Sequence, residues 1–351
     1  MYRKFIKSTL MATISILLIF SFIIIVIDPF YHYHKPLKKM KPVVNDERYQ
    51  NPGIAEHFSY DSILTGSSMT QNFRISELDK TFECDTIKLT YSAIRTGSFK
   101  YMFEKAFSTR NIKNVFMGLD IDPLLDTYGN YYFPLPEYLY DDNIFNDVNY
   151  VLNKDVMFKE AYGYLKANYK GTVQNIDDAY MWQKNFSEED ALKSVTWSLL
   201  EQGERTKMPQ YLENTKKNLE KNILPYIEGH PETTFYIFFP PYSLLWWNMH
   251  VNYGDLEDVM KVLVYTSSEL LKYDNVKLYS FQDIKEVITN LNIYVDYNHY
   301  NQDINSEMIK WMKEEKYRLT KDNYEDRISN FYHYVNEFDY SLWEAKRLEL
   351  F

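Results

Sequence analysis

Short apolar stretches alternate with segments of helical periodicity along most of this chain, and this alternation limits its fold more than any other feature. Five of the apolar stretches are predicted to be strands: 59–65, 86–91, 114–119, 235–239 and 276–280. Helical spacing is found between them, at 75–82, 98–107 and 256–271. Apolar strands separated by helices favour a mostly parallel sheet that is covered on both faces. The sequence therefore predicts an α/β fold, a three-layer sandwich around that sheet.

Residues 10–27 form an 18-residue run that is apolar apart from one threonine and two serines. A run of this length reaches the lower limit for a transmembrane helix. A cleaved signal peptide is the alternative, but the run ends in bulky residues and no small-x-small cleavage site follows it. We therefore expect an uncleaved membrane anchor over residues 1–30. Basic residues flank the run on both sides, so the positive-inside rule does not fix its orientation.

The rest of the chain is predicted to have three parts. Residues 31–56 contain three prolines and a glycine with weak periodicity, which predicts a linker. Residues 57–317 are predicted to form the α/β domain. The alternation of strands and helices breaks at about 122–205, which predicts an aromatic-rich insertion covering the carboxyl edge of the sheet. Residues 318–351 are predicted to be a C-terminal helical tail.

Composition excludes several classes of protein. The net charge of −10 and the lack of a basic stripe argue against a nucleic-acid binder. Cys84 is the only cysteine, so no intramolecular disulfide can form. His32 and His34 lie close together, but no further His or Cys joins them in the sequence. Neither a His-Glu-x-x-His motif nor a P-loop is present. We therefore expect no metal site and no cofactor.

Two short motifs more than two hundred residues apart carry the chemistry. Gly-Ser-Ser at 66–68 follows the first predicted strand, and Asp-Tyr-Asn-His at 296–299 precedes an amphipathic helix. Ser, His and Asp are the residues that a nucleophile, its base and the group that orients the base require. Each motif alone is weak, since Gly-Ser-Ser is common in turns and helix caps. Because strand ends meet at one edge of a parallel sheet, the two motifs can come together there.

The two motifs resemble those of the SGNH, or GDSL-type, hydrolase family. In that family the nucleophile is the third residue of a Gly-Asp-Ser block, and a late Asp-x-x-His supplies the other two groups. The resemblance implies that Ser68 is the nucleophile, His299 the base and Asp296 the residue that orients the base. Ser67 stands where the family has Asp and is expected to form the turn. The Gly-x-Ser-x-Gly elbow of other α/β hydrolases fits poorly, because Thr70 replaces its second Gly.

The resemblance is weaker at the oxyanion hole. The family uses the nucleophile's own amide, a Gly after the second strand and the Asn of a Gly-x-Asn-Asp block. Here the second group is expected to be Gly97, with Ala93 nearby, while Asp120 takes the place of the Asn. An ionised carboxylate cannot donate a hydrogen bond, and loss of one donor costs about 10²–10³ in rate. Either Asp120 is protonated, or another donor such as Asn72 replaces it, or the protein is slow or inactive as a hydrolase.

Other residues near the predicted site have two interpretations each. Arg95 can pair with a phosphate or carboxylate of a substrate, or it can form a salt bridge with Asp120 or Asp122. The tyrosine-rich insertion and the pair Trp246 and Trp247 can stack on sugar rings, or they can fill a core or an interface.

The stretch 238–243, with its two prolines, and the Asp-Pro-Phe at 28–30 resemble the membrane-anchored DltD-like branch of the family. That branch is tied to D-alanylation of teichoic acids and similar acyl chemistry of the cell envelope. The resemblance implies an extracytoplasmic serine esterase or O-acyltransferase on a single-pass anchor. Its expected partners are an acylated glycan or polyol-phosphate polymer and the lipid bilayer, with a membrane-bound acyltransferase as a candidate.

Two alternatives without catalysis remain open. The chain can be a non-catalytic SGNH-fold module that binds a glycan or a membrane partner, and Asp120 favours this interpretation. It can also be a structural anchor for a polysaccharide-export assembly. The complete Ser68, Asp296 and His299 set argues against the binding module, and co-purification without a stable membrane partner would count against the structural anchor.

Overall fold

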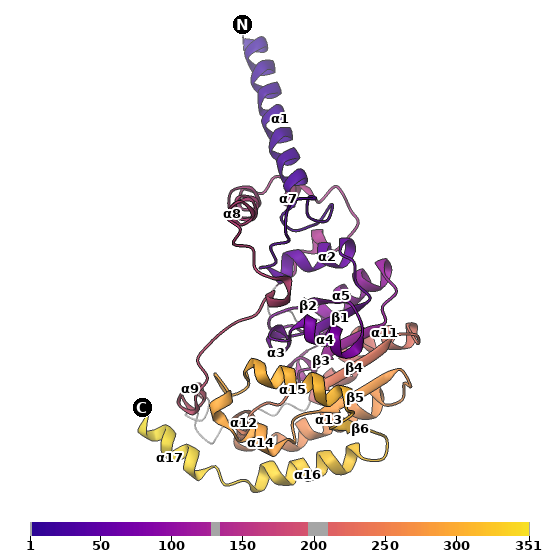
Figure 1. Ribbon diagram of the computed structural model, residues 1–351, viewed down its shortest axis with the longest axis vertical. Helices are drawn as coiled ribbons and strands as arrows, with labels where there is room; N and C mark the ends of the chain where they lie inside the picture. The colour runs from indigo at the N-terminus through magenta and orange to yellow at the C-terminus, as the bar shows by residue number, and fades with distance from the viewer. Residues whose placement is uncertain (1, 128–133, 196–209, 351) are drawn as a thin grey trace. The chain divides into compact units, whose positions relative to one another are not determined.

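The computed structural model describes residues 2–127, 134–195 and 210–350. The chain divides into two compact units, whose elements are labelled in Figure 1. Unit 1 combines Met1–Ser59 with Pro134–Tyr180, and unit 2 combines Tyr60–Phe133 with Met181–Phe351.

Unit 2 contains a six-stranded sheet with the order β2-β1-β3-β4-β5-β6. Its strands are β1 (Ser62–Gly66), β2 (Thr86–Thr90), β3 (Asn114–Gly118), β4 (Thr234–Phe239), β5 (Val276–Ser280) and β6 (Arg318–Leu319). The first five are parallel and β6 is antiparallel to β5. Every residue of β1, β2 and β3 is buried, the polar ones included, as expected for a parallel sheet that is covered on both faces. The predicted α/β class with a mostly parallel sheet is confirmed, and β6 was not predicted.

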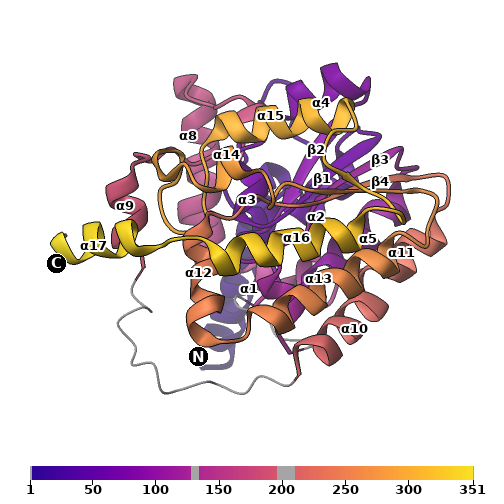
Figure 2. The same ribbon diagram turned by 90° about the horizontal axis from the view of Figure 1, so that it is seen from below.

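The helices of unit 2 connect these strands. They are α3 (Ser68–Gln71), α4 (Ile75–Phe82), α5 (Thr96–Thr109), α6 (Asp122–Leu125), α9 (Glu188–Lys193), α10 (Tyr211–Asn222), α11 (Leu224–Gly229), α12 (Leu244–Tyr253), α13 (Leu256–Leu270), α14 (Lys285–Ile288), η5 (Leu291–Ile293), α15 (Gln302–Lys313), α16 (Tyr324–Glu337) and α17 (Ser341–Glu349). Helix α4 packs against α15, whereas α10 packs against α5 and α13, and α13 against α16. Figure 2 shows α4 and α15 on one side of the strands and α10, α13 and α16 on the other.

Unit 1 is a smaller helical unit that includes the N-terminal helix. Its elements are α1 (Tyr2–Ile27), α2 (Glu47–His57), η1 (Glu137–Leu139), α7 (Val148–Val151), the π-helical turn η2 (Val156–Ala161), α8 (Tyr162–Lys170) and η3 (Ile176–Asp178). Helix α1 has 26 residues and is long and apolar enough to cross a membrane. Most of its side chains are exposed, but Ile24 is fully buried in a cluster with Phe30, Leu139, Tyr150 and Val156.

Asp28 holds the end of α1 in place. Its buried carboxylate accepts hydrogen bonds from the backbone N–H groups of residues 32–34 and from the Tyr150 hydroxyl at 2.8 Å. Burial raises the pKa of this carboxyl, although these hydrogen bonds oppose the shift. Residues that are 122 positions apart in the sequence therefore meet directly below the helix.

The division into units differs from the domain bounds expected from the sequence. The expected linker at 31–56 contains most of α2, whose residues 50–55 are buried. A Cβ on Gly53 would come within 2.4 Å of the carbonyl oxygens of Phe30 and Tyr31, so this glycine permits close packing and does not mark a loop. Of the expected insertion at 122–205, residues 134–180 belong to unit 1, while 128–133 and 196–209 lie outside the described residues. The expected helical tail contains α16 and α17 but begins with β6.

Gly66 ends β1 with a φ of +141°, a backbone conformation that residues with a Cβ rarely adopt. A Cβ here would also lie 2.6 Å from Thr70 Cγ2. We expect Gly66→Ala to lower the free energy of unfolding of unit 2 by about 1–3 kcal/mol. All six tryptophans fall in the sequence ranges of unit 2, so tryptophan fluorescence during guanidinium unfolding reports this change.

Gly229→Ala in α11 is the matched control for this substitution. No atom lies within 4 Å of a Cβ built on Gly229, which is exposed. This variant is expected to unfold at the same denaturant concentration as the wild type or slightly above it, because alanine favours a helix more than glycine does. Equal stability of the Gly66→Ala variant and the wild type would contradict the conclusion that the backbone at position 66 requires a glycine.

Candidate active site

The strand order places a crevice at one point along the carboxyl edge of the sheet. After β2 the chain crosses back over β1 to form β3, so β1 and β3 are neighbours and their outgoing connections run in opposite directions. Ligands in open parallel sheets bind at such a switch point. Ser68 follows β1 and Asp120 follows β3, so both residues lie at this point.

Ser68 is the first residue of α3, directly after the turn at Gly66. Ser67 caps this short helix: its hydroxyl accepts a hydrogen bond from Met69 N at 3.1 Å. Ser67 is 6% exposed, whereas Ser68 is partly exposed. The expectation that Ser67 forms the turn and Ser68 points out of it therefore agrees with the local geometry.

His299 lies on a tight loop between η5 and α15. An isolated bridge pairs Tyr294 with Tyr300 across the base of the loop. The Tyr300 hydroxyl donates to Met69 O at 3.2 Å, and the Tyr294 hydroxyl donates to Pro241 O at 2.8 Å. These two bonds tie the loop to α3 and to the end of β4, which fixes the imidazole above the crevice.

The three predicted residues form a continuous hydrogen-bonded chain. Ser68 Oγ lies 2.7 Å from His299 Nε2, across a sequence separation of 231 residues. His299 Nδ1 lies 2.7 Å from Asp296 Oδ2 and 3.0 Å from Oδ1. The side chains of His299 and Asp296 are 27% and 26% exposed. A nucleophile and its base within hydrogen-bond reach, with the base held by a third group, is the arrangement that covalent catalysis requires.

The environment of Asp296 favours its charged form. Burial alone would raise its pKa, but the hydrogen bond and charge of His299 and the backbone N–H groups of Asn298 and His299 together lower the pKa. An ionised Asp296 accepts the Nδ1–H of His299, which leaves Nε2 unprotonated to accept the Ser68 proton. The neutral tautomer of His299 is thus the one that a general base needs.

Trp182 is a residue of this site that the sequence analysis did not identify. Its ring packs edge-on against the His299 imidazole, with 5.6 Å between ring centroids. Its indole N–H donates to Ser68 O at 3.4 Å, and its backbone N–H donates to Asn72 Oδ1 at 3.0 Å. Trp182 precedes α9 in an irregular stretch, so no periodicity or motif marked it.

Asp120 is buried beside the triad and is only 6% exposed. Tyr242, after β4, donates its hydroxyl to Asp120 Oδ1 at 2.5 Å. Among the described residues Oδ2 has no well-formed hydrogen bond, although the Ser67 hydroxyl is near enough to lower the pKa. Burial outweighs the Ser67 and Tyr242 hydrogen bonds and raises the pKa of Asp120 to about 6. Asp120 is therefore mostly ionised at pH 7 but protonates under mildly acidic conditions.

The remaining predicted residues surround the crevice in different ways. Gly97 lies in the first turn of α5, which the sequence analysis placed after the second strand, and its role as a donor stays a prediction. Asn72 is buried, and its side-chain amide oxygen accepts the hydrogen bond from the backbone N–H of Trp182 described above. Arg95 forms an ion pair with Asp126 at the end of α6, with Nε 3.0 Å from Oδ2, and its charge also opposes the burial that raises the pKa of Asp122.

Trp246 and Trp247 belong to the core of unit 2. Both are completely buried in α12, and their rings contact each other, Tyr242 and Phe331. Of the two interpretations that the sequence allowed, sugar stacking is wrong for these two residues and core packing is correct.

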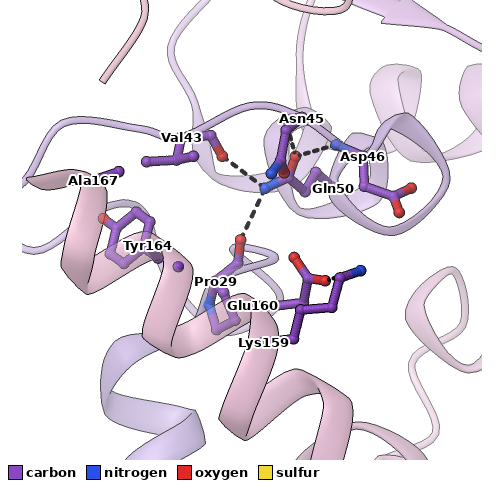
Figure 3. A pocket seen from close by; sticks show the side chains of 10 residues that line it. Pro29, Val43, Asn45, Asp46, Gln50, Lys159, Glu160, Tyr164 and Ala167 are labelled. Carbon is purple, nitrogen blue, oxygen red and sulfur yellow. Dashed lines mark hydrogen bonds and ion pairs between the residues drawn. The ribbon is translucent and has the colours of Figure 1, made fainter. Parts of the chain in front are cut away.

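Unit 1 contains a separate cavity of about 340 Å³. Figure 3 shows Gln50 beside it, with an amide that donates to Pro29 O and Val43 O and accepts from the N–H groups of Asn45 and Asp46. The amide of Gln50 is thus fully hydrogen-bonded within the protein. No serine or histidine is among the residues that line this cavity, so it has no pair like Ser68 and His299 of unit 2.

No family model matches this chain, and neither does any curated protein. The chemistry of the site is therefore interpreted from its geometry and from the residues that form it. The triad Ser68, His299 and Asp296 and the buried Asp120 are the features on which that interpretation depends.

The raised pKa of Asp120 predicts a pH-dependent stability. The folded protein holds this proton up to a pH of about 6, whereas the unfolded chain releases it near 3.8, so ionisation destabilises the fold as the pH rises between these values. Asp120→Asn has no carboxyl to ionise. We therefore expect its free energy of unfolding at pH 7 to exceed that of the wild type by up to about 3 kcal/mol.

Guanidinium unfolding of both proteins at pH 4 and at pH 7 measures this difference. Asparagine can still accept the Tyr242 hydrogen bond, so the substitution preserves the local packing. Asp274→Asn, at an exposed position, is the control and should change the free energy of unfolding at neither pH. A constant difference between Asp120→Asn and the wild type across this pH range would show that the Asp120 carboxyl does not titrate as described.

Proposed function

We propose that unit 2 is a three-layer SGNH-type domain and that the chain is a serine esterase or O-acyltransferase. The observation that carries this proposal is the hydrogen-bonded chain from Ser68 through His299 to Asp296 at the switch point of the sheet. The order of the two motifs and their positions after β1 and before α15 match the resemblance noted in the sequence.

The proposed reaction has two steps. Ser68 Oγ attacks the carbonyl carbon of an ester while its proton passes to His299 Nε2, and the positive imidazolium is stabilised by Asp296. The tetrahedral intermediate then collapses, and the leaving alcohol takes the proton from His299. In the second step a water or a sugar hydroxyl gives its proton to His299 and attacks the acyl carbonyl carbon; the ester bond to Ser68 Oγ then breaks and Ser68 takes the proton back from His299. Water yields a free acid and an acceptor hydroxyl yields a new ester, so hydrolysis and transfer use the same groups.

Asp120 determines how well this site can stabilise the oxyanion. At pH 7 a carboxyl with a pKa of about 6 is protonated in roughly a tenth of the molecules, and only that form can donate a hydrogen bond. The Ser68 amide, at the start of α3, remains available as a donor from the backbone. The proposal is therefore an enzyme with modest activity whose oxyanion hole is incomplete at neutral pH.

The location and substrate follow from α1 and from the resemblance. A 26-residue helix that is long and apolar enough to cross a membrane can anchor the chain in a bilayer. We place unit 2 on the outer side of the cell membrane, where acylated polysaccharides and teichoic-acid-like polymers provide the esters. A reporter protein that functions only in the cytoplasm, fused after residue 351, should be inactive, and an active reporter would overturn this orientation.

A second candidate function is a non-catalytic module that binds a glycan or a membrane partner. The specific observation in its favour is Asp120, which places a carboxylate where the family has an amide donor. A negative group beside the nucleophile disfavours a developing oxyanion and so harms catalysis. A protein that only binds its partner has no oxyanion to stabilise, so the carboxylate would not harm its function.

The decisive experiment treats the detergent-solubilised full chain with a fluorophosphonate probe and locates the modified residue by mass spectrometry. We expect labelling at Ser68 that is absent in Ser68→Ala and slowed by about 10²–10⁴ in His299→Ala, because the base supplies that factor. Ser67→Ala is the matched control one residue away; it removes the cap of α3 but leaves the nucleophile, so labelling should persist. Asp120→Asn should label faster than the wild type at pH 7 because it restores a donor.

The outcome separates the two candidates. Labelling that depends on both Ser68 and His299 supports the enzyme. An absence of labelling in a chain that shows cooperative unfolding would favour the binding module. In that case rapid labelling of Asp120→Asn would identify the carboxylate as the reason for the inactivity.

A further inference from the structure

Large apolar side chains are exposed on one part of unit 1. Apart from those on α1, eight of the twelve such side chains in the described residues lie between positions 144 and 169. They are Ile144, Phe145, Val148, Leu152, Phe158, Tyr162, Leu165 and Tyr169. Phe145 is 86% exposed and Tyr169 93%, so these side chains are not covered by the described part of the chain. We call this set the apolar face of unit 1.

Four residues of the apolar face form a stripe along η2 and α8. Phe158, Tyr162, Leu165 and Tyr169 are spaced by four, three and four residues, which places them on one side of a helix. The opposite side packs inward: Ala161 and Tyr164 are buried. Figure 3 shows Glu160 and Tyr164 of this inner side at the cavity described above. The helix is therefore amphipathic, but its apolar stripe faces away from the core.

The apolar face is continuous with the surface of α1. The ring of Phe158 packs edge-on against the ring of Phe20, with 6.0 Å between centroids. Helix α1 packs against both η2 and α7. Ile24, one turn after Phe20, is buried in the core of unit 1, and Asp28 bonds to Tyr150 of α7. The last two turns of α1 are thus held firmly against the residues that carry the apolar face.

The length of α1 fixes the depth of this contact. From Ser8 to Ile27 the helix has 20 residues without a charge, which span about 30 Å. The hydrocarbon core of a bilayer is also about 30 Å thick, so the whole of this segment is needed to cross it. Phe20 lies seven residues before Ile27, about 10 Å from that end. A side chain in contact with Phe20 must then lie at the membrane boundary and not in water.

We propose that the apolar face of unit 1 is a second membrane contact, in which η2 and α8 lie in the interface of the bilayer beside α1. Aromatic side chains such as Phe158, Tyr162 and Tyr169 are favoured at the headgroup level. Lys166 and Lys170 flank the stripe and are exposed, as in helices that lie on anionic lipid surfaces. Unit 1 is then seated on the membrane, and α1 is not a flexible tether.

Continuity with α1 favours lipid over a protein as the occupant of this face. A partner protein would have to contact Phe158 at the level where lipid already surrounds the neighbouring residues of α1. Burial of these side chains in lipid removes their apolar surface from water, which stabilises the arrangement. The proposal does not depend on the activity of Ser68, and it requires only that α1 crosses a bilayer.

The test uses the full chain in vesicles of phosphatidylcholine and phosphatidylglycerol. Cys84→Ser removes the only cysteine, and single nitroxide labels are then attached at Phe158→Cys, Leu165→Cys and Tyr169→Cys. Electron paramagnetic resonance measures how fast each label collides with oxygen, which enters lipid, and with a water-soluble nickel complex. We expect the ratio of oxygen to nickel accessibility to be several-fold higher at these positions than at Leu348→Cys. Leu348 is an exposed leucine of unit 2 and serves as the matched control.

Two further labels make the result unambiguous. A label at Leu18→Cys on α1 must report lipid, and water-like accessibility there would overturn both the anchor and the proposal. Lys154→Cys, exposed at the start of the same segment but outside the stripe, should report water. Nickel accessibility at Phe158 and Leu165 equal to that at Leu348 would overturn the proposal. Labels shielded from both reagents would also overturn the proposal, because such shielding would show a contact with protein. If the shielding were lost on dilution with lipid, the contacting protein would be a second copy of the chain.

Discussion

The position of β1 between β2 and β3 is the constraint on which the candidate site depends. Because these strands are parallel, each connection leaves from the carboxyl edge of the sheet and returns over one of its faces to the start of the next strand. The connection after β1 and the one after β3 diverge, which opens the crevice where Ser68 and Asp120 lie. The loop carrying His299 is held at the same crevice by hydrogen bonds that Tyr294 and Tyr300 donate to Pro241 O and Met69 O, and by one that Ser243 donates to Tyr297 O. Two motifs separated by more than two hundred residues thus meet through sheet topology and a set of hydrogen bonds to this loop.

The site combines one well-satisfied carboxylate with one poorly satisfied carboxylate. Asp296 accepts hydrogen bonds from His299 and from two backbone N–H groups, so its pKa is lowered despite burial. Burial of Asp120 outweighs its hydrogen bonds with Ser67 and Tyr242 and raises its pKa, so its charge destabilises the fold at neutral pH. Perturbed pKa values of this kind cluster at functional sites. The buried carboxyl of Asp120 is therefore the feature on which the choice between the proposed enzyme and the proposed binding module depends.

Much of the fold could be predicted from the sequence because short strand-like stretches that contain apolar residues alternate with segments of helical spacing. The five parallel strands were found in this way, whereas β6 has two residues and no pattern. The serine, histidine and aspartate of the candidate site could be named because their order, Ser before Asp-x-x-His, resembles that of the SGNH family. Trp182 could not, because it approaches His299 from an irregular segment. The pairing of Arg95 with Asp126 depends on the angle at which α6 leaves β3, which no local pattern encodes.

Unit 1 was the part that the sequence described least well, for a physical reason. Its contacts join residues 1–59 with 134–180, and bonds such as Asp28 to Tyr150 link positions 122 residues apart. Pro52 and Gly53 suggested a linker, but Gly53 is there to let α2 approach the backbone below α1. A helix held at its end by a buried carboxylate cannot pivot freely, so the orientation of α1 is transmitted to α7 and η2. A flexible tether would not need this fixed contact between α1 and the rest of unit 1. The contact agrees with the proposal that the apolar face of unit 1 is held at a fixed depth in the bilayer.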